Sequence, residues 1–421
     1  MAVRHPRAQV GLVVLLALLL RLGHVLLYDH WPAVSGGDYA WYASNGRLLV
    51  QTGQTPGPLP TGPLFVLVAG YAGQIQPLDP GGGQALVRVL HAFLSALTVW
   101  MVYRIGQAAW THAVGLAAAL ALAIGPAFII EAGNLTTETM AIFLTCWALA
   151  LWLERIRSPD GRLMAATGSL LALAALTRSV LLAFPLVPLS HLLLRYGLRR
   201  ALRQGIVLIA ALLFTLSPWT VYNLVQWHRF TLTGEGLLGT LYVGAVGWKD
   251  PAEVDAELGF EGSASPEGDY QARQEAFAQG IAEVVLSDPL GYLARRGVSL
   301  AGALLQPHNT VFYPGESIKT LVLDWLRDDR SLGGLATLTG ADAFWPKLLL
   351  YAFHYAALIF GVAGLILNRR RWRSLWPLYA AFGYFLGIHL VLDAIPRYLF
   401  PLEPLWWLFA AATVRRYNTA R

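Results

Sequence analysis

Cysteine and charge are scarce in this 421-residue chain. Its one cysteine, Cys146, excludes an internal disulfide framework and a multi-thiolate metal site, because each needs at least two thiols. Charged residues make up 13% of the sequence, against about 25% in an ordinary soluble protein, whereas 56% of the residues are hydrophobic. With a mean hydropathy of +0.50, the composition excludes a disordered, collagen-like or coiled-coil chain. It predicts an all-α, polytopic integral membrane protein.

The motifs of common soluble enzymes are also missing. The sequence has no glycine-rich phosphate loop, zinc-ligand spacing, nucleophile elbow or kinase signature, and Gly81-Gly82-Gly83 is not followed by Lys-Ser or Lys-Thr. Chemistry is therefore expected from polar residues near the ends of membrane helices, where burying a charge is costly and usually has a functional reason.

Ten apolar runs predict transmembrane helices, most of them near the roughly 20 residues that about 30 Å of hydrocarbon requires. They lie at residues 9–28, 84–103, 112–130, 139–153, 163–176, 180–194, 204–218, 346–367, 375–392 and 398–414. A further stretch, residues 62–75, is short and lies between glycine and proline clusters. We therefore predict about ten membrane helices, with 62–75 as a re-entrant or interfacial segment.

The arginines set the expected orientation. With both termini inside, the inner segments hold more than half of the 31 basic residues, including the clusters at 195–203 and 369–373. Counting 62–75 as a span would place both clusters outside, against the positive-inside rule. The net charge of +6 is thus a topology signal, and no nucleic-acid partner is expected. We predict a bacterial cytoplasmic (inner) membrane protein with a retained first helix, because residues 21–24 offer no signal-peptidase site.

Three parts follow from this topology. They are a membrane module at 1–218 with a first outer loop at 29–83, an outer (periplasmic) segment at 219–345, and a C-terminal three-helix membrane segment at 346–421. Within the outer parts, the apolar spacing predicts a surface helix at 39–51 and helices at 269–286 and 290–305, the last two separated by Asp288-Pro289.

Four ionisable residues at outer helix ends form the candidate site. Asp38 follows the first helix, Glu138 begins the fourth, Arg178 ends the fifth and Arg397 begins the last. Structural roles stay open for the first three, as a helix N-cap for Asp38 and as complements of helix dipoles for Glu138 and Arg178. Arg397 opposes the dipole of the helix that it begins, which favours an anion-binding role.

Several short motifs, taken in order along the chain, carry a resemblance. They are Gly37-Asp38-Tyr39-x-x-Tyr42, Thr136-Thr137-Glu138-Thr139, Leu176-Thr177-Arg178, Ser217 to Asn223, Gly239 to Gly244, Asp288-Pro289-x-x-Tyr292 and Arg397-Tyr398. Their order and the predicted topology resemble the protein O-mannosyltransferase and aminoarabinose (lipid A) transferase-like superfamily, membrane enzymes of the GT-C fold similar to glycosyltransferase family 39. Many members have Asp-Glu where this chain has Asp38-Tyr39, so the adjacent carboxylate of a two-carboxylate metal site is absent here.

The resemblance implies transfer of a sugar from a polyprenyl-phosphate donor to an acceptor hydroxyl at the outer face, with inversion at the anomeric carbon. Because phosphate leaves as a stabilised anion, one carboxylate suffices as general base, and Asp38 is expected in that role. Arg178 and Arg397, with Arg88 as a third candidate, are expected to bind the donor phosphate. Glu138 is expected to position the acceptor or to share a divalent metal ion with Asp38, and metal dependence stays open.

Further residues are expected to line the cavity for substrate and carrier chain. They are Tyr39, Tyr42, Arg21, His24, Tyr242 and Tyr398. Arg21 and His24 lie one helical turn apart in the first helix, and either snorkel to the interface or share the outer cavity with Asp38.

A second class of protein, a transporter or flippase of a lipid-linked sugar, would also need outer cations and a membrane cavity. Such proteins often contain inverted repeats, and this sequence shows none, although Gly115, Gly125 and Pro126 interrupt the third apolar run. We therefore predict a membrane glycosyltransferase, either a hexosyl- or a pentosyltransferase. The sugar, the oligomeric state and the acceptor, whether lipid, glycan or protein, are not read from any motif.

Overall fold

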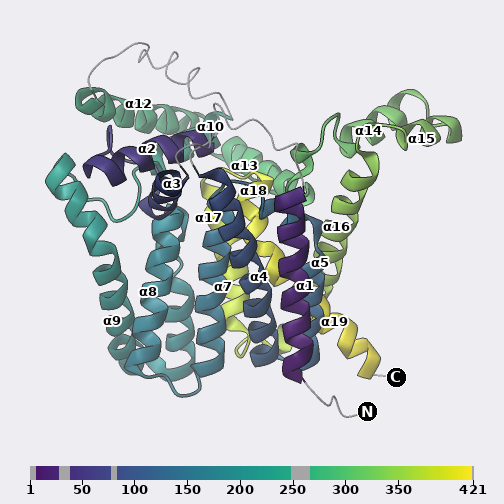
Figure 1. Ribbon diagram of the computed structural model, residues 1–421, viewed down its shortest axis with the longest axis horizontal. Coiled ribbons are helices and arrows are strands. Elements are labelled where there is room, and N and C mark those ends of the chain that lie inside the picture. The colour runs from purple at the N-terminus through teal and green to yellow at the C-terminus, as the bar shows by residue number, and fades with distance from the viewer. Residues whose placement is uncertain (1–5, 28–37, 77–82, 248–265, 420–421) are drawn as a thin grey trace.

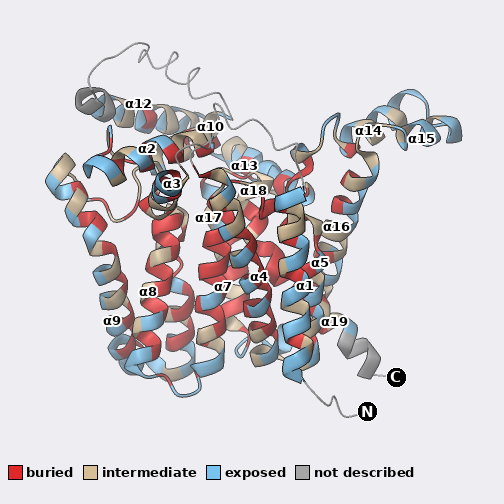
Figure 2. Cartoon of the chain, viewed as in Figure 1, coloured by how far each residue is buried: buried red, intermediate tan, exposed pale blue. Residues whose placement is uncertain are grey.

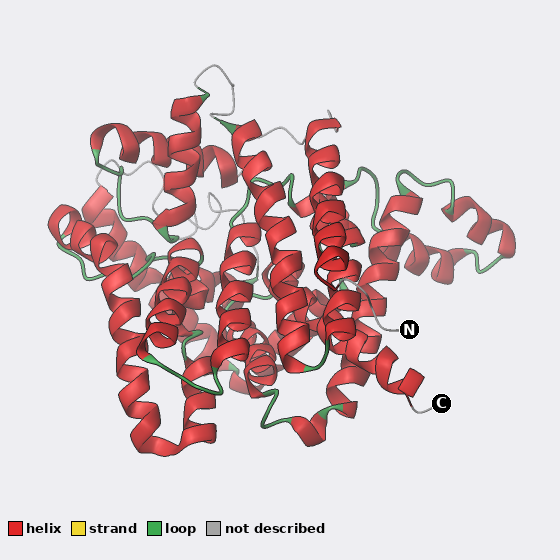
Figure 3. Cartoon of the chain, turned by 60° about the horizontal axis from the view of Figure 1, so that its bottom comes forward, coloured by secondary structure: helices red, strands yellow, loops and turns green. Residues whose placement is uncertain are grey.

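The computed structural model describes residues 6–27, 38–76, 83–247 and 266–419. Within these ranges every regular element is a helix, as the composition predicts (Figure 3). The longest helices run side by side as a bundle, and shorter helices lie across one end of it, which we call the cap end (Figure 1).

Four helical stretches are long and apolar enough to cross a membrane. They are α1 (Pro6–Leu27), α4 (Gln84–Ala109), the 3-10 helix η1 (Ser179–Ala183) continuing into α9 (Leu186–Trp227), and α16 (Phe344–Leu367). Shorter helices complete the bundle: α5 (His112–Ile124), α7 (Glu138–Arg155), α8 (Gly161–Thr177), α17 (Trp376–Val391) and α19 (Glu403–Thr419). The total of ten membrane crossings stays a prediction.

Glycine and proline break the helices at two places, one inside a predicted span and one between two predicted spans. The run at 112–130 is not one helix, because Pro126 lacks a backbone N–H; α5 ends at Ile124 and the short α6 (Pro126–Glu131) begins after Gly125. Helix α9 bends sharply at Gly197, whose positive φ of 74° suits glycine. Its two arms correspond to the predicted helices at 180–194 and 204–218.

Burial separates the inside of the bundle from its outer faces. Buried residues concentrate on α7, α8 and α17, whereas α1 and α9 present many exposed apolar side chains, as expected of helices that face lipid (Figure 2). Small residues let helices approach closely: a Cβ atom on Gly106 of α4 would lie 2.5 Å from the Cα atom of Gly115 in α5.

The cap end holds the helices of the segments that are predicted to be outer (Figure 1). They are α2 (Asp38–Thr52), α3 (Pro63–Ile75), α10 (Leu237–Val246), α12 (Pro266–Ser287) and α13 (Pro289–Leu305), while α14 (Ile318–Asp328) and α15 (Leu332–Leu338) project beside α16. The predicted helices at 39–51, 269–286 and 290–305 are confirmed. The 3-10 helices η2 (Thr310–Phe312), η3 (Arg369–Arg371) and η4 (Phe400–Leu402), with the one-turn α18 (Pro396–Leu399), make the connections.

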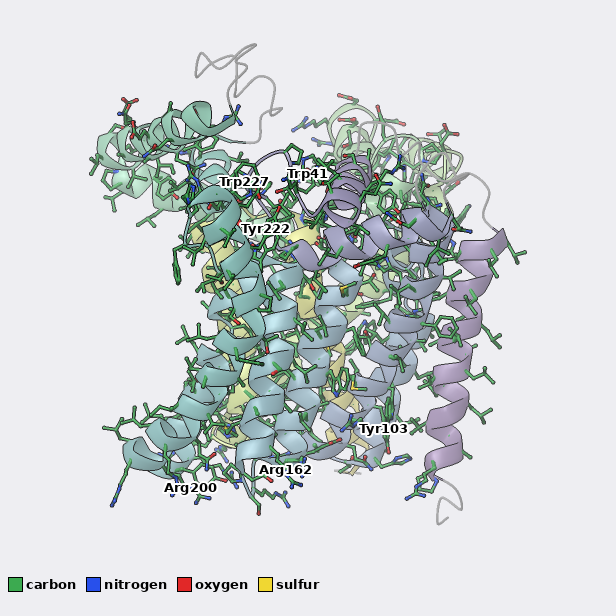
Figure 4. All side chains as sticks on the ribbon, turned by 60° about the vertical axis from the view of Figure 1, so that its left-hand side comes forward. Trp41, Tyr103, Arg162, Arg200, Tyr222 and Trp227 are labelled. Carbon is green, nitrogen blue, oxygen red and sulfur yellow. The ribbon has the colours of Figure 1, made fainter. Side chains whose placement is uncertain are left out.

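Helices α2 and α3 touch through their backbones. A Cβ atom on Gly46 would overlap the carbonyl oxygen of Val66, and one on Gly70 would overlap that of Gly46. The stretch at 62–75 is therefore a helix packed on α2, which fixes the position of Asp38 at the start of α2. Figure 4 shows Trp41 and Tyr222 at the cap end and Arg162 and Arg200 at the opposite end, as the charge pattern predicts.

Candidate active site

The four ionisable residues predicted as the site meet at the cap end, each from a different helix end. Asp38 is the first residue of α2 and Glu138 the first residue of α7. Arg178 directly follows α8, where its extended backbone (φ −139°, ψ 112°) ends the helix. Arg397 is the second residue of α18, which Pro396 begins. Helix ends thus bring together residues up to 359 positions apart in the sequence.

Glu138 lies at the centre of this group and is fully buried. Arg397 donates two hydrogen bonds to the Glu138 carboxylate, from Nε to Oε1 at 2.6 Å and from Nη2 to Oε2 at 3.2 Å. Arg178 donates from Nη1 to the same Oε1, and also to Thr137 Oγ1 at 3.1 Å. A buried carboxylate is stable as an ion only when it is paired and hydrogen-bonded, and Glu138 is both. It therefore holds the two arginines in place and is not free to accept a proton.

Asp38 contacts the same cluster from the solvent side. Arg397 Nη1 donates to Asp38 Oδ2 at 2.6 Å, and the Asp38 side chain is 55% exposed. Burial of the Arg397 guanidinium lowers its pKa, but the charges of Glu138 and Asp38 outweigh this effect and raise the pKa above its ordinary value. Arg397 thus stays charged and joins one buried carboxylate to one accessible carboxylate.

Aromatic side chains surround the cluster. The Arg178 guanidinium lies 5.2 Å from the ring centre of Tyr398, a cation–π contact. Tyr42 is buried on α2 with its ring 5.0 Å from that of Phe65 in α3, and Tyr39 is buried beside Asp38. Burial is the main cause that raises the pKa of Tyr42 to about 12, so its hydroxyl stays protonated at neutral pH. Tyr42 can donate a hydrogen bond but cannot act as a base.

A second buried carboxylate, Glu131, lies at the end of α6 and was not anticipated from the sequence. Its carboxylate accepts hydrogen bonds from Asn134 Nδ2 at 2.7 Å and from Thr136 Oγ1 at 2.6 Å. His308 Nε2 lies 2.8 Å from Oε2, and Asn309 Nδ2 donates to Oε2 at 3.3 Å. This network ties the loop after α13 to the loop that leads into Glu138. The polar run between Glu131 and Glu138 was the one available signal, and nothing in the sequence pointed to His308.

Arg21 has a different place from the one predicted. It is fully buried in α1 and donates to Ser95 Oγ at 2.6 Å and to the carbonyl oxygens of Leu122 and Ala123 at 3.0 Å each. These carbonyls are at the C-terminal end of α5, where helical hydrogen bonding runs out before the break at Gly125. The expectation that Arg21 snorkels or shares the cavity of Asp38 is wrong, because its guanidinium is used to cap a helix.

Three other predicted residues contact neighbours outside the four-residue cluster. His24 packs on Phe312 with ring centres 5.8 Å apart, and Tyr242 of α10 packs on Phe277 of α12 at 5.1 Å. Arg88 donates from Nε to the carbonyl oxygen of Gly133 at 3.0 Å and so supports the α6–α7 loop. A role for Arg88 in phosphate binding stays a prediction.

The partners of the buried cations distinguish supporting residues from site residues. Arg296 binds the carbonyl oxygens of Gly244 and His389 at 3.0 Å each, and Lys347 Nζ binds three consecutive backbone carbonyls at 2.6–2.9 Å. Like Arg21, they donate mainly to backbone carbonyls, although Arg296 Nη1 also lies 3.9 Å from Asp393 Oδ1. Arg178 and Arg397 instead bind carboxylates at an accessible end of the bundle, where an anionic ligand can compete for their N–H groups.

The geometry does not suit a divalent metal held by Asp38 and Glu138. The Arg397 guanidinium lies between the two carboxylates and hydrogen-bonds to both. Among the side chains that the structure describes, no group of three or more His, Cys, Asp or Glu is arranged to hold a metal ion. We derive no chemical step through a metal.

The chain is similar to known proteins both in sequence and in structure. Residues 80–225 match the family model of the dolichyl-phosphate-mannose-protein mannosyltransferases, a range that includes Glu138 and Arg178. No curated protein sequence matches the chain significantly. The archaeal oligosaccharyltransferase AglB from Archaeoglobus fulgidus, in complex with an inhibitory peptide and a dolichol-phosphate, superposes with a TM-score of 0.56 at 15% identity over 99% of this chain. The chain has the GT-C fold.

Two further GT-C structures are similar at low identity. The Archaeoglobus fulgidus oligosaccharyltransferase in complex with zinc and sulfate gives a TM-score of 0.56 at 16% identity and covers 97% of this chain. ArnT from Cupriavidus metallidurans, bound to undecaprenyl phosphate, gives 0.44 at 17% identity and covers 98% of this chain and 78% of its own. This chain spans about half the length of the two oligosaccharyltransferase chains, 51% and 49%. The resemblance that the sequence motifs indicated is confirmed at the level of the fold.

Proposed function

We propose that this GT-C chain is a membrane glycosyltransferase that moves a sugar from a polyprenyl-phosphate donor to an acceptor hydroxyl at the outer face of the cytoplasmic membrane, with inversion. One observation carries the proposal: two guanidinium groups, those of Arg178 and Arg397, converge with the accessible carboxylate of Asp38 at one end of an apolar bundle. The AglB structure holds a dolichol-phosphate, which is the kind of lipid phosphate that such a site suits.

The chemistry follows from the charges. The acceptor oxygen forms a bond to the anomeric carbon as the bond from that carbon to the phosphate oxygen breaks, and the phosphate leaves with the electron pair. Arg397 and Arg178 stabilise the phosphate, because guanidinium N–H groups match its oxygens in pairs. Asp38 accepts the proton of the acceptor hydroxyl, and its exposure leaves it open to an acceptor that arrives from solvent or from the lipid surface.

Glu138 takes a different role from the one expected. Its carboxylate is engaged by both arginines and is fully buried, so it orients them and does not touch the acceptor. Tyr398 and Tyr42 close the cluster on the protein side, which keeps the guanidinium groups partly shielded from water and strengthens their attraction for phosphate.

The test is transfer of labelled sugar from defined polyprenyl-phosphate donors to a membrane extract by the purified protein. Wild type should transfer label, and Asp38→Asn and Arg397→Ala should each lose at least a hundredfold in rate, roughly the contribution of a general base or of one charge-stabilising group. Asp288→Asn is the matched control, since Asp288 is equally exposed (58%) in an ion pair with Arg295 but caps α13 outside the site. Wild type that consumes no donor, yet moves lipid-linked sugar between leaflets in liposomes, would instead indicate a transporter.

A further inference from the structure

An apolar cleft lies between the two arms of α9, toward the end of the bundle opposite the cap. Its volume is about 520 Å³, within the range of about 300–1,000 Å³ that is typical of pockets for small molecules. Leu189 and Leu193 of the first arm face Leu202, Ile206 and Leu213 of the second arm, and every residue that lines the cleft is apolar. The cleft could thus hold hydrocarbon without leaving a polar group unsatisfied.

The cleft opens outward, away from the core. Leu198, Leu202 and Ile206 on its wall are each more than half exposed, whereas Leu192 and Leu208 on the other side of the arms are fully buried in a cluster with Trp152. The arms also touch each other, because a Cβ atom on Gly205 would lie 2.9 Å from Leu189 Cδ2. In a membrane, the open side faces the lipid chains.

Arginines crowd the turn where the two arms meet. Four of them surround Gly197, namely Arg195, Arg199, Arg200 and Arg203. Arg200 lies 4.5 Å from the ring centre of Tyr196, whose hydroxyl donates to the carbonyl oxygen of Ile156 in the α7–α8 loop. The end of α7, this loop and the start of α8 add three more arginines, Arg155, Arg157 and Arg162. Figure 4 shows Arg162 and Arg200 at the same end of the molecule.

The two acidic side chains near this turn, Glu154 of α7 and Asp160 before α8, do not cancel that charge. Glu154 pairs with Arg104, with Nε 2.7 Å from Oε1, and Asp160 caps α8 by accepting from the backbone N–H of Leu163 at 2.7 Å. The mouth of the apolar cleft is therefore strongly and locally positive. Topology alone requires positive charge at this end, but it does not require an apolar cleft beside that charge.

We propose that this cleft binds one anionic phospholipid of the leaflet at the basic end, with an acyl chain between the arms of α9 and the phosphate on the arginines of the turn. Arginine suits a phosphate group, and the cytoplasmic leaflet supplies anionic headgroups. The site lies at the other end of the bundle from Asp38 and Arg397, so it is separate from the proposed donor site. A bound lipid joins the two arms and stabilises the hairpin.

Native mass spectrometry and thermal unfolding of the delipidated full-length protein test this proposal. Phosphatidylglycerol should bind more tightly than phosphatidylcholine with the same acyl chains, by roughly fivefold for each arginine engaged, and should raise the melting temperature more. Glycerol phosphate, which has the headgroup chemistry without chains, should do neither. Equal binding of the two phospholipids, or occupation by undecaprenyl phosphate alone, would overturn the proposal.

Three variants, two of them double variants, separate the cleft from general electrostatics. The double variant Arg199→Gln, Arg203→Gln should lose the preference for phosphatidylglycerol, whereas Arg369→Gln, Arg370→Gln should keep it. Both remove two positive charges from the basic end, so an effect on topology would appear in both. Ala210→Phe fills the exposed cleft with the charges intact and should also lose the bound lipid. Sugar transfer should persist in all three, and a preference that survives Ala210→Phe would contradict chain binding in the cleft.

Discussion

Replacing Asp38 by asparagine should separate donor binding from catalysis. In the free protein, Arg397 uses Nε and Nη2 to bind Glu138 and Nη1 to bind Asp38. Three of the five N–H groups of Arg397 are therefore occupied, and a donor phosphate that binds Arg397 through a pair of N–H groups competes with Asp38 for the guanidinium. Asparagine keeps the shape of the Asp38 side chain but removes its charge, so it competes less well. The variant should therefore bind polyprenyl phosphate more tightly while it loses the base needed for transfer.

The expected gain in phosphate affinity follows from the exposure of the Asp38–Arg397 ion pair. Ion pairs at the protein surface contribute about 0.2–1 kcal/mol. The Asp38–Arg397 pair has a short contact of 2.6 Å, but its side chains are 27% exposed for Arg397 and 55% exposed for Asp38. We expect about 1 kcal/mol, equivalent to roughly fivefold tighter binding of polyprenyl phosphate. Loss of a general base should lower the transfer rate by about 10²–10⁴. The two effects have opposite signs, which a misfolded variant cannot reproduce.

Titration of nanodisc-embedded protein with polyprenyl phosphate, alongside transfer assays, measures both quantities. Asp288→Asn should leave both unchanged, because its partner Arg295 lies outside the site and asparagine also caps helices. If Asp38→Asn binds polyprenyl phosphate no more tightly than wild type, Asp38 does not compete for Arg397. If the variant still transfers sugar at the wild-type rate, Asp38 is not the base.

Three further predictions concern residues that hold the helices and charges around the site in place. Glu138→Gln should lower the free energy of unfolding by about 2–3 kcal/mol, because it leaves two arginines partly buried beside a neutral amide. Thermal unfolding in detergent measures this change, and an unchanged melting temperature would contradict the pairing. Arg21→Gln should destabilise by about 1–3 kcal/mol through the uncapped end of α5, while the KM for donor in surviving enzyme stays the same. Gly46→Ala should push α2 away from α3 and reduce transfer, whereas Gly11→Ala, where a Cβ atom meets nothing within 4 Å, should not.

Helix positions were largely predictable, because apolar runs and their flanking turn residues are local properties of the sequence. Asp288-Pro289 marked the boundary between α12 and α13. The stretch at 62–75 is the short helix α3, and its place outside the membrane spans stays a prediction. The run at 112–130 was misread as one helix although Gly125-Pro126 lies inside it, because hydropathy does not register a missing N–H. The bend at Gly197 lies in the arginine-rich stretch that separated two predicted spans, so hydropathy located the break, but its sharpness depends on one backbone angle that the sequence does not show.

The site was only partly predictable, for a physical reason. Asp38, Glu138, Arg178 and Arg397 could be selected because ionisable groups at membrane helix ends are costly to place there. The sequence did not show how they pair, and so it did not show that both arginines bind Glu138. The contact between His308 and Glu131 joins residues 177 positions apart and depends wholly on packing. Arg21 shows the same limit, since the sequence places a charge on a helix but not the carbonyls that it reaches.

The charge balance of the cluster determines what a donor must do on arrival. Two guanidinium groups and two carboxylates sum to zero, so a phosphate gains most where it takes the place of a carboxylate. Glu138 is fully buried and receives three guanidinium hydrogen bonds, whereas Asp38 is half-exposed and receives one. Asp38 is therefore the carboxylate that a phosphate displaces more easily. In the proposed mechanism, the donor phosphate takes the place of Asp38 on Arg397. The exchange releases Asp38 from its ion pair beside the acceptor, so that its carboxylate is most available as a base when a donor is bound.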